Sequence, residues 1–305
     1  MAAVITMFEF SPVSESIASS AFEARKSEWR EACIFARKLC RKAYCREDTQ
    51  ITSLVLFHRY GVSIAAESVG EARSRSPTPT PPPQGSSQSL RYARSVASNT
   101  SLTTVSVSPL WHVACGCVFL ASKLEEDKKK AKHVANAALA IRRGVDMEDI
   151  PSGDIDALVK CILECERDAL YASGYSIVVR NSRELIIRYF EKYVDASEVA
   201  FKRRCMGVCR DALLCNACVC FPRKVVAAAI IAISAKSIKK QTNISKITAN
   251  AIHGFENAAA TAKTIMGAPL SNINSVIRYL AKHAFPLSCI PDHEMPLLDE
   301  ILFAI

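Results

Sequence analysis

Hydrophobic residues recur along this chain at the spacing of an α-helix. Beginning at Trp29, apolar side chains follow at Cys33, Ala36, Cys40 and Ala43, every three or four residues. A repeat of this period places them on one face of a helix, where they can pack against a core. The opposite face is basic, with Arg30, Arg37, Lys38, Arg41 and Lys42.

The same spacing predicts helices through most of the chain. The stretch from Leu110 to Leu124 is apolar nearly all round, which is typical of a helix in the middle of a bundle. A later helix opens at Ser152, and Gly174 is its expected C-cap, since glycine readily adopts the left-handed conformation that ends many helices. The other predicted helices are 49–64, a basic helix ending near residue 143, 182–194, 196–214, 222–237, 244–265 and 271–283.

One stretch breaks the helical pattern. Residues 71–108 are rich in serine, threonine and proline, a composition that cannot bury a core, so we expect a disordered insertion at about 65–108. Ser76, Thr78 and Thr80 each precede a proline, as substrates of proline-directed kinases do. Phosphorylation there and an unmodified spacer are both compatible with the sequence.

The helical pattern starts again in the second half of the chain. Residues 112–123 align without gaps with residues 225–236, and both are apolar, rich in small residues and end in lysine. Small residues allow neighbouring helices to approach closely, so each segment reads as the central helix of its own bundle. The sequence therefore predicts an all-α protein of two similar domains, 22–180 and 181–285, with an N-terminal extension (1–21) and a C-terminal tail (286–305).

The composition of the chain limits its kinds of partner and its cellular compartment. The net charge of +9 suits an acidic partner or nucleic acid, and equally an ordinary solvated surface. The 13 cysteines are odd in number and lie on apolar helix faces, which favours reduced thiols and hence the cytosol or nucleus. The first residues lack a secretory signal pattern, and the longest apolar run, 225–235, is too short for a membrane span.

Catalytic and metal-binding signatures are missing from the sequence. Cys215 and Cys218 form one C-x-x-C pair, but a zinc ribbon needs a second, and the nearby Cys205 and Cys209 are expected to pack as thiols. We find no P-loop, Rossmann glycine pattern, H-E-x-x-H, G-x-S-x-G or kinase signature. The sequence therefore predicts a protein without catalytic residues, cofactor or bound metal.

Several motifs, in a fixed order, resemble the cyclin family. Leu120-Ala121-Ser122-Lys123-Leu124-Glu125-Glu126 is similar to the L-A-S/A-K-x-E-E end of the third helix of a cyclin box. Glu166, Leu170, Gly174 and Tyr175 match the pattern of the fifth helix. Residues 55–60 (VLFHRY) resemble the end of the second helix, and residues 221–235 the third helix of a second box. The resemblance implies two tandem five-helix cyclin-box bundles.

The resemblance also implies a non-catalytic subunit that binds and activates a cyclin-dependent serine/threonine kinase. In cyclins, the residues matching Lys123 and Glu166 hydrogen-bond to the kinase backbone near its mobile helix. The apolar seat for that helix corresponds to Leu124, Leu170, Tyr175 and Ile177. Without the resemblance, the charged pair would be ordinary helix-end residues, and Leu170 and Tyr175 would be core residues.

The transcription and splicing cyclins of L, K and T type are the most similar branch. They imply a nuclear protein whose complex acts on the RNA polymerase II tail or on splicing factors. A rival class, the B-type general transcription factors, uses two cyclin folds to bind DNA and polymerase, and the basic charge suits it. Such factors carry an N-terminal zinc ribbon, whereas residues 1–28 contain no cysteine, so we do not expect direct nucleic-acid binding.

Overall fold

A computed structural model describes residues 25–74, 109–241 and 270–284, with side chains from 65–74, 236–241 and 270–271 left aside. All regular secondary structure in these ranges is helical, which confirms the all-α fold class. The helices are α2 (Lys26–Lys42), α3 (Glu47–Ser74), α5 (Leu110–Leu124), α6 (Ala131–Arg143), the short 3-10 helix η1 (Met147–Asp149), α7 (Ser152–Ala172), α8 (Ser182–Tyr193), α9 (Val199–Ala212), α10 (Ala217–Cys220), α11 (Arg223–Gln241) and α14 (Leu270–His283).

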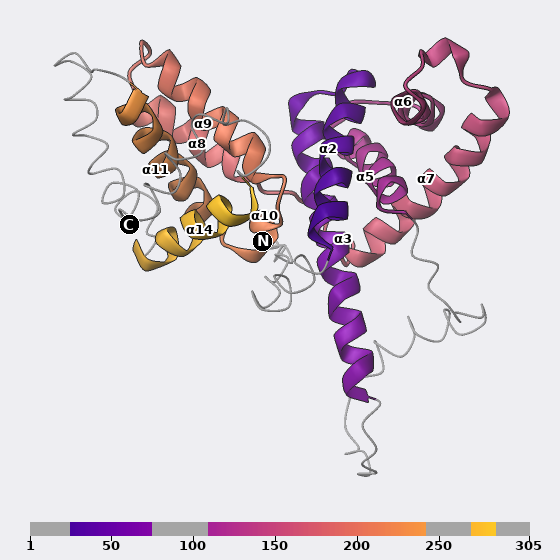
Figure 1. Cartoon of the computed structure of the whole chain (residues 1–305), viewed down its shortest axis with the longest axis horizontal. Coiled ribbons are helices and arrows are strands. Elements are labelled where there is room, and N and C mark those ends of the chain that lie inside the picture. Colours follow the sequence, from indigo (N-terminus) through magenta and orange to yellow (C-terminus); the bar gives the residue numbers. More distant parts are fainter. Residues whose placement is uncertain (1–24, 75–108, 242–269, 285–305) are drawn as a thin grey trace, which may run out of the picture.

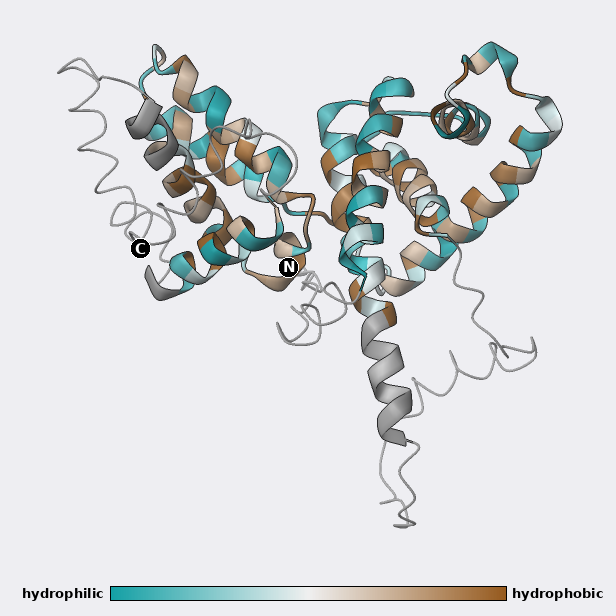
Figure 2. Ribbon diagram, viewed as in Figure 1, coloured by the Kyte–Doolittle hydropathy of each residue, from teal (hydrophilic) through white to brown (hydrophobic). Residues whose placement is uncertain are grey.

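The first bundle is built around α5. This helix packs against α2, α3, α6 and α7, and Figure 1 shows it enclosed by them. Its side chains from Val113 to Ser122 are all buried, as the uninterrupted apolar pattern predicts. In Figure 2, most of α5 carries the colours of hydrophobic residues.

The second bundle is built around α11 in the same way. That helix contacts α8, α9, α10 and α14, and residues 225–235 are buried. In Figure 1 this group of helices lies beside the first bundle, with the chain passing between them ahead of α8. The two central helices are the pair that the internal alignment of the sequence identified, so the arrangement of tandem helical bundles follows the predicted one.

Most predicted helix boundaries lie within a few residues of the observed ones, and two differences are worth explaining. The helix predicted to end at residue 64 continues as α3 to Ser74, because residues 65–74 contain alanine, glutamate and arginine, and the proline-rich composition starts only afterwards. The single-turn helix α10, just before Pro222, was not predicted because four residues are too few to show a period. The extension 1–21, Ser76, Thr78 and Thr80, the helix expected at 244–265 and the tail 286–305 fall on residues outside the described ranges.

Trp29, His58 and Leu213 form the centre of the seam between the bundles. Trp29 Nε1 donates to Nδ1 of His58 at 2.9 Å, so the other ring nitrogen, Nε2, carries the proton and donates to the Leu213 carbonyl at 2.9 Å. Burial of the ring lowers the pKa of His58 to about 4, against an opposing effect of that carbonyl. His58 is therefore a neutral hydrogen-bonded link between α3 in one bundle and the end of α9 in the other.

Charged side chains reinforce the seam. Arg183 of α8 pairs with Glu47 and Asp48 at the start of α3, each at 3.1 Å. The buried guanidinium of Arg30 donates to the carbonyl of Ala284 after α14 at 3.2 Å. Burial lowers the pKa of Arg30, since a buried cation loses hydration. These contacts tie both ends of the second bundle to the first.

Within the described ranges, every helix is too short or too polar to cross a bilayer.

Candidate functional site

Lys123 and Glu166 form a close ion pair between α5 and α7. The Lys123 ammonium lies 2.7 and 2.9 Å from the two carboxylate oxygens of Glu166, and 4.2 Å from the centre of the Phe119 ring. The Lys123 side chain is 50% exposed and that of Glu166 is 11% exposed. The structure thus brings together, at the edge of the first bundle, the two charged residues that the sequence singled out from separate helices.

Gly116 is the residue that allows this pairing. A Cβ atom there would lie 2.6 Å from Cβ of Cys165 and 2.8 Å from the backbone nitrogen of Glu166, closer than real Cβ contacts come. Gly116 and Lys123 are two helical turns apart and so share a face of α5. The close approach of α5 to α7 at Gly116 sets the position of Glu166 opposite Lys123.

An exposed group of apolar side chains lies along α7 and the segment after it. We call Leu163, Tyr171, Tyr175, Ile177 and Val178 the apolar strip; their exposed fractions run from 45% to 68%. The rings of Tyr171 and Tyr175 meet edge to face at 6.5 Å. Several exposed apolar side chains gathered in one short segment mark interaction sites more often than single exposed residues do.

The predicted apolar seat divides into an exposed and a covered part. Tyr175 and Ile177 are exposed members of the apolar strip, whereas Leu124 and Leu170 are half-buried and pack against the core. Tyr171 and Val178 are exposed in the same segment and were not singled out from the sequence. The only sequence signal for Tyr171 was an apolar residue outside the core stripe of a predicted helix, and Val178 lay in the segment between two predicted helices.

Tyr175 is displayed by an unusual backbone conformation. Both Gly174 (φ 58°) and Tyr175 (φ 59°) are left-handed, which costs an aromatic residue free energy that glycine avoids. The Tyr175 amide donates to the Leu170 carbonyl at 3.0 Å and the Gly174 amide to that of Tyr171 at 2.9 Å, which hold the turn in place. The C-cap of α7 is Ser173, one residue before the glycine predicted there, and Gly174 is the left-handed residue that follows the cap. The turn points Tyr175 outward instead of into the core.

Arg59 clamps the segment that carries the strip. Its guanidinium donates to the carbonyl of Ser176 at 2.8 Å and to that of Val178 at 3.2 Å, on either side of Ile177. Arg59 is 8% exposed, and burial lowers its pKa. A buried arginine that binds two carbonyls fixes an extended backbone without any regular secondary structure. In the sequence, Arg59 stood out only as part of the VLFHRY motif at 55–60, which gave it no role of its own.

Hydrogen bonds to the start of α3 hold the loop that follows Lys123. Thr52 of α3 donates to Glu125 at 2.6 Å, and Asp127 accepts hydrogen bonds from the Arg46 amide at 2.8 Å and Thr49 at 3.0 Å. Burial alone would raise the pKa of Asp127, but these bonds and a contact with Lys129 outweigh it and lower the pKa. The first acidic residue of the K-x-E-E motif therefore holds the loop against α3, while Lys123 remains at the surface.

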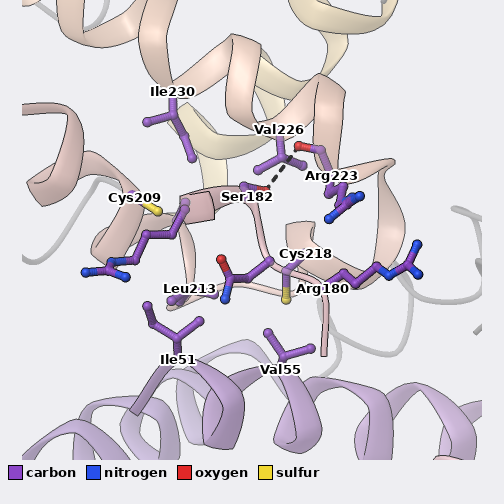
Figure 3. Close-up of a pocket in the computed structure, with 13 residues that line it drawn as sticks. Ile51, Val55, Arg180, Ser182, Cys209, Leu213, Cys218, Arg223, Val226 and Ile230 are labelled. Atoms are coloured by element: carbon purple, nitrogen blue, oxygen red, sulfur yellow. Dashed lines mark hydrogen bonds between the residues drawn. The ribbon is translucent and has the colours of Figure 1, made fainter. Parts of the chain in front are cut away.

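A small pocket opens at the seam between the bundles (Figure 3). Ile51 and Val55 rise from α3 on one side, and Val226 and Ile230 come from α11 on the other. The Ser182 hydroxyl donates to the Arg223 carbonyl at 3.2 Å, which joins the start of α8 to the start of α11. The mostly apolar lining, without a nucleophile–base pair, indicates packing between the bundles and not a reaction centre.

The cysteine group that resembled a metal site is distributed through the second bundle. Cys205, Cys209 and Cys215 are buried, and burial raises the pKa of each thiol to about 12. Within residues 25–74, 109–241 and 270–284, no group of three or more cysteine, histidine or acidic side chains is arranged to hold a metal ion. These thiols pack as small apolar groups.

Comparison with known proteins gives a structural neighbour and no sequence relative. No model of a known protein family matches the chain, and neither does any curated protein. Among solved structures, the chain is similar to a chain of the crystal structure of the yeast RNA Pol II CTD kinase CTDK-1 complex, with a TM-score of 0.52 and 14% sequence identity. The match covers 98% of this chain and 92% of that one. At this identity the likeness shows a shared fold, which is compatible with a cyclin and does not separate one cyclin type from another.

Proposed function

We propose that this chain is a cyclin: a non-catalytic regulatory subunit that binds and activates a cyclin-dependent serine/threonine kinase. The observation that carries the proposal is the Lys123–Glu166 pair, because Glu166 lies on α7, and α7 together with the segment directly after it carries the apolar strip. The chain would act with its kinase on the RNA polymerase II tail, in the nucleus, as cyclins of the L, K and T types do. The solved structure that shares its fold is a kinase complex for that tail, so the polymerase tail is the substrate to test first, with splicing factors as the other class that these cyclins imply.

The charged pair suits recognition of peptide backbone. An ammonium has three N–H donors and a carboxylate has lone pairs beyond those that Lys123 uses, so the pair can bind a carbonyl and an amide of a partner at once. Lys123 and Glu166 neutralise each other, and this reduces the cost of covering them. Such a pair fixes the register of a docked helix more than it adds affinity.

The apolar strip suits the buried side of the same interface. Tyr171, Tyr175 and Ile177 present large apolar groups on a backbone that the α7 cap and Arg59 already hold. Because this surface is ordered before binding, less conformational entropy is lost when a partner helix docks. An amphipathic helix of the partner would lay its apolar face on the strip and its exposed backbone end on the ion pair.

Activation follows from where the docked helix is held. In protein kinases, a glutamate on a mobile helix must pair with a lysine that binds the phosphates of ATP. A cyclin that grips that helix stabilises its inward position and so completes the pair. This chain supplies binding energy and orientation for that step, and the kinase provides all the residues that contact the transferred phosphoryl group.

A charge exchange tests the proposal with the ion pair kept intact. Lys123→Glu combined with Glu166→Lys retains an attractive pair but reverses the charges seen by a partner. The matched control exchanges Arg143 and Asp154, a 2.7 Å pair on the same bundle, with side chains 43% and 46% exposed. Tagged proteins are recovered from cells of the species that encodes the chain, and captured kinase activity is assayed on a peptide of polymerase II tail repeats.

We expect wild type and the Arg143/Asp154 exchange to recover ATP-dependent activity on the peptide. The Lys123/Glu166 exchange should reduce the recovered activity at least about tenfold, while its thermal unfolding temperature stays unchanged. If wild type recovers no kinase, the shared fold serves another function, and retarded migration of a DNA duplex at low salt would then favour the B-type transcription factors.

A further inference from the structure

The turn between α2 and α3 brings two cysteines together. The Cys45 amide donates to the Cys40 carbonyl at 2.7 Å, the Tyr44 amide donates to that of Arg41 at 3.1 Å, and Tyr44 is left-handed (φ 53°). These are the two hydrogen bonds and the backbone conformation of a Schellman helix end. In this motif the first and last residues, here Cys40 and Cys45, are brought next to each other, and their side chains commonly make contact.

The two thiols lie in different surroundings. Cys40 is fully buried, and its sulfur lies 3.8 Å from the Ser53 hydroxyl. Cys45 is half-buried, beside the highly exposed Tyr44. The side chains of Cys40 and Cys45 influence each other directly: their interaction raises the pKa of Cys40 and lowers that of Cys45. One sulfur of the pair is therefore open to a reagent from solvent, and the other lies buried behind it.

The surroundings of Cys45 also favour its thiolate. The neighbouring Cys40 side chain lowers the pKa of Cys45, and Lys129 assists, against the opposing effects of burial and Asp127. The Lys129 ammonium is held in place, 2.7 Å from the Tyr44 carbonyl and 3.2 Å from Asp127. The buried cysteines behave oppositely, since burial raises the pKa of Cys33, Cys115, Cys117, Cys205, Cys209, Cys215 and Cys218.

We propose that Cys40 and Cys45 are a redox modification site, which a hydroperoxide oxidises to a reversible disulfide. The Cys45 thiolate attacks the peroxide O–O bond and becomes a sulfenic acid, while the other oxygen leaves as water after taking up a proton. The Cys40 thiol then attacks the Cys45 sulfur, the S–S bond forms and the sulfenic hydroxyl leaves as water. Overall, two thiols and one hydrogen peroxide give one disulfide and two water molecules.

The position of the pair makes this reaction compatible with the fold. The Schellman turn already places Cys40 and Cys45 at the two ends of one hydrogen-bonded loop, so the sulfurs can meet without unwinding a helix. The disulfide would close a short loop at the end of α2 and add little stability, which suits a bond that thiols can reduce again. In a reducing compartment, disulfides of this kind are transient and serve as signals.

Peptide mapping of the full chain tests the proposal directly. Reduced protein is treated with hydrogen peroxide, remaining thiols are blocked with iodoacetamide, and the protein is digested with trypsin. Because cleavage follows Lys38, Arg41, Lys42 and Arg46, the disulfide would link the tripeptide 39–41 to the tetrapeptide 43–46. We expect this linked pair, lighter by two hydrogen atoms than its parts, to form first and to disappear on treatment with dithiothreitol.

Three variants separate the roles of the residues. Cys45→Ser should abolish the linked peptide, and Cys40→Ser should leave a sulfenic acid at position 45 that dimedone traps. Lys129→Met should slow the reaction of Cys45 with iodoacetamide by about threefold, as expected when a thiolate loses a nearby cation. The proposal is overturned if the wild-type pair stays reduced while other cysteines oxidise, or if the linked peptide forms only in denaturant.

Discussion

Gly116 of α5 lies directly against the backbone of Glu166 in α7: a Cβ atom at Gly116 would come within 2.8 Å of the Glu166 nitrogen. The two helices therefore touch backbone to backbone at the point from which Glu166 reaches Lys123. This contact connects the fold to its function, because any side chain at position 116 must separate the helices and move Glu166.

Gly116→Ala should therefore reduce both stability and kinase binding. Overpacking of this kind costs about 1–3 kcal/mol in the free energy of unfolding, which urea denaturation followed by circular dichroism measures. Gly207→Ala in α9 is the matched control, since a Cβ there meets nothing within 4 Å. It should leave stability unchanged or raise it by about 0.5–1 kcal/mol. Equal effects of the two substitutions would contradict the proposed helix contact.

His58 predicts a loss of stability in mild acid. Its pKa is about 4 in the folded protein, below the ordinary value of about 6.5, so the unfolded chain takes up a proton that the folded chain does not. The contribution is fully present above about pH 6.5 and falls as the pH drops toward 4. Between pH 7 and pH 5 the free energy of unfolding should fall by about 2 kcal/mol from this residue alone.

Comparison with His58→Gln isolates this contribution. Glutamine retains an N–H donor for the Leu213 carbonyl but does not titrate in this range. Urea unfolding at a series of pH values should therefore show a shallower slope for the variant between pH 5 and 6.5. Identical slopes would mean that His58 is not held neutral at the seam.

Arg59 should control kinase affinity without touching the kinase. Arg59→Met retains much of the side-chain volume but leaves the carbonyls of Ser176 and Val178 without their donor, so the strip loses its fixed backbone. We expect faster amide exchange at residues 176–180 and kinase binding weakened by about tenfold. Arg59→Lys, which retains a cation and donors, should recover part of both. Unchanged binding alongside faster exchange would show that order in this segment does not matter for docking.

Tyr175→Asn should separate stability from binding. Asparagine tolerates the left-handed backbone that tyrosine adopts at a cost, so the free energy of unfolding should stay within about 0.5 kcal/mol of wild type or rise. Binding of the kinase should nevertheless fall, because the most exposed ring of the apolar strip is gone. A co-purification assay alongside thermal unfolding measures both. Loss of stability with full binding would assign Tyr175 to folding instead.

Much of this structure was predictable because its signals are periodic. The observed bounds of α5 are those predicted, and Lys123 and Glu166 stood out through the motifs around them. Arg59 did not, since its partners are backbone carbonyls more than a hundred residues away. Every residue has a backbone carbonyl, so the sequence cannot show which ones a side chain will bind. The same is true of His58 and Leu213 at the seam. Left-handed Tyr175 was likewise hidden, because the turn was expected to need only Gly174.

The proposed docking of a kinase on the apolar strip is tested most directly by photo-crosslinking at Tyr175. Replacing this residue with the photoreactive p-benzoylphenylalanine places the probe on the exposed apolar strip, and the same replacement at Tyr193 in α8 is the control, since it is 43% exposed on the other bundle. After irradiation in cells, mass spectrometry identifies the linked peptides. We predict a crosslink from position 175 to the mobile helix of a protein kinase and none from position 193. A crosslink from position 175 to a polymerase subunit or DNA-bound factor, with no kinase, would contradict the account.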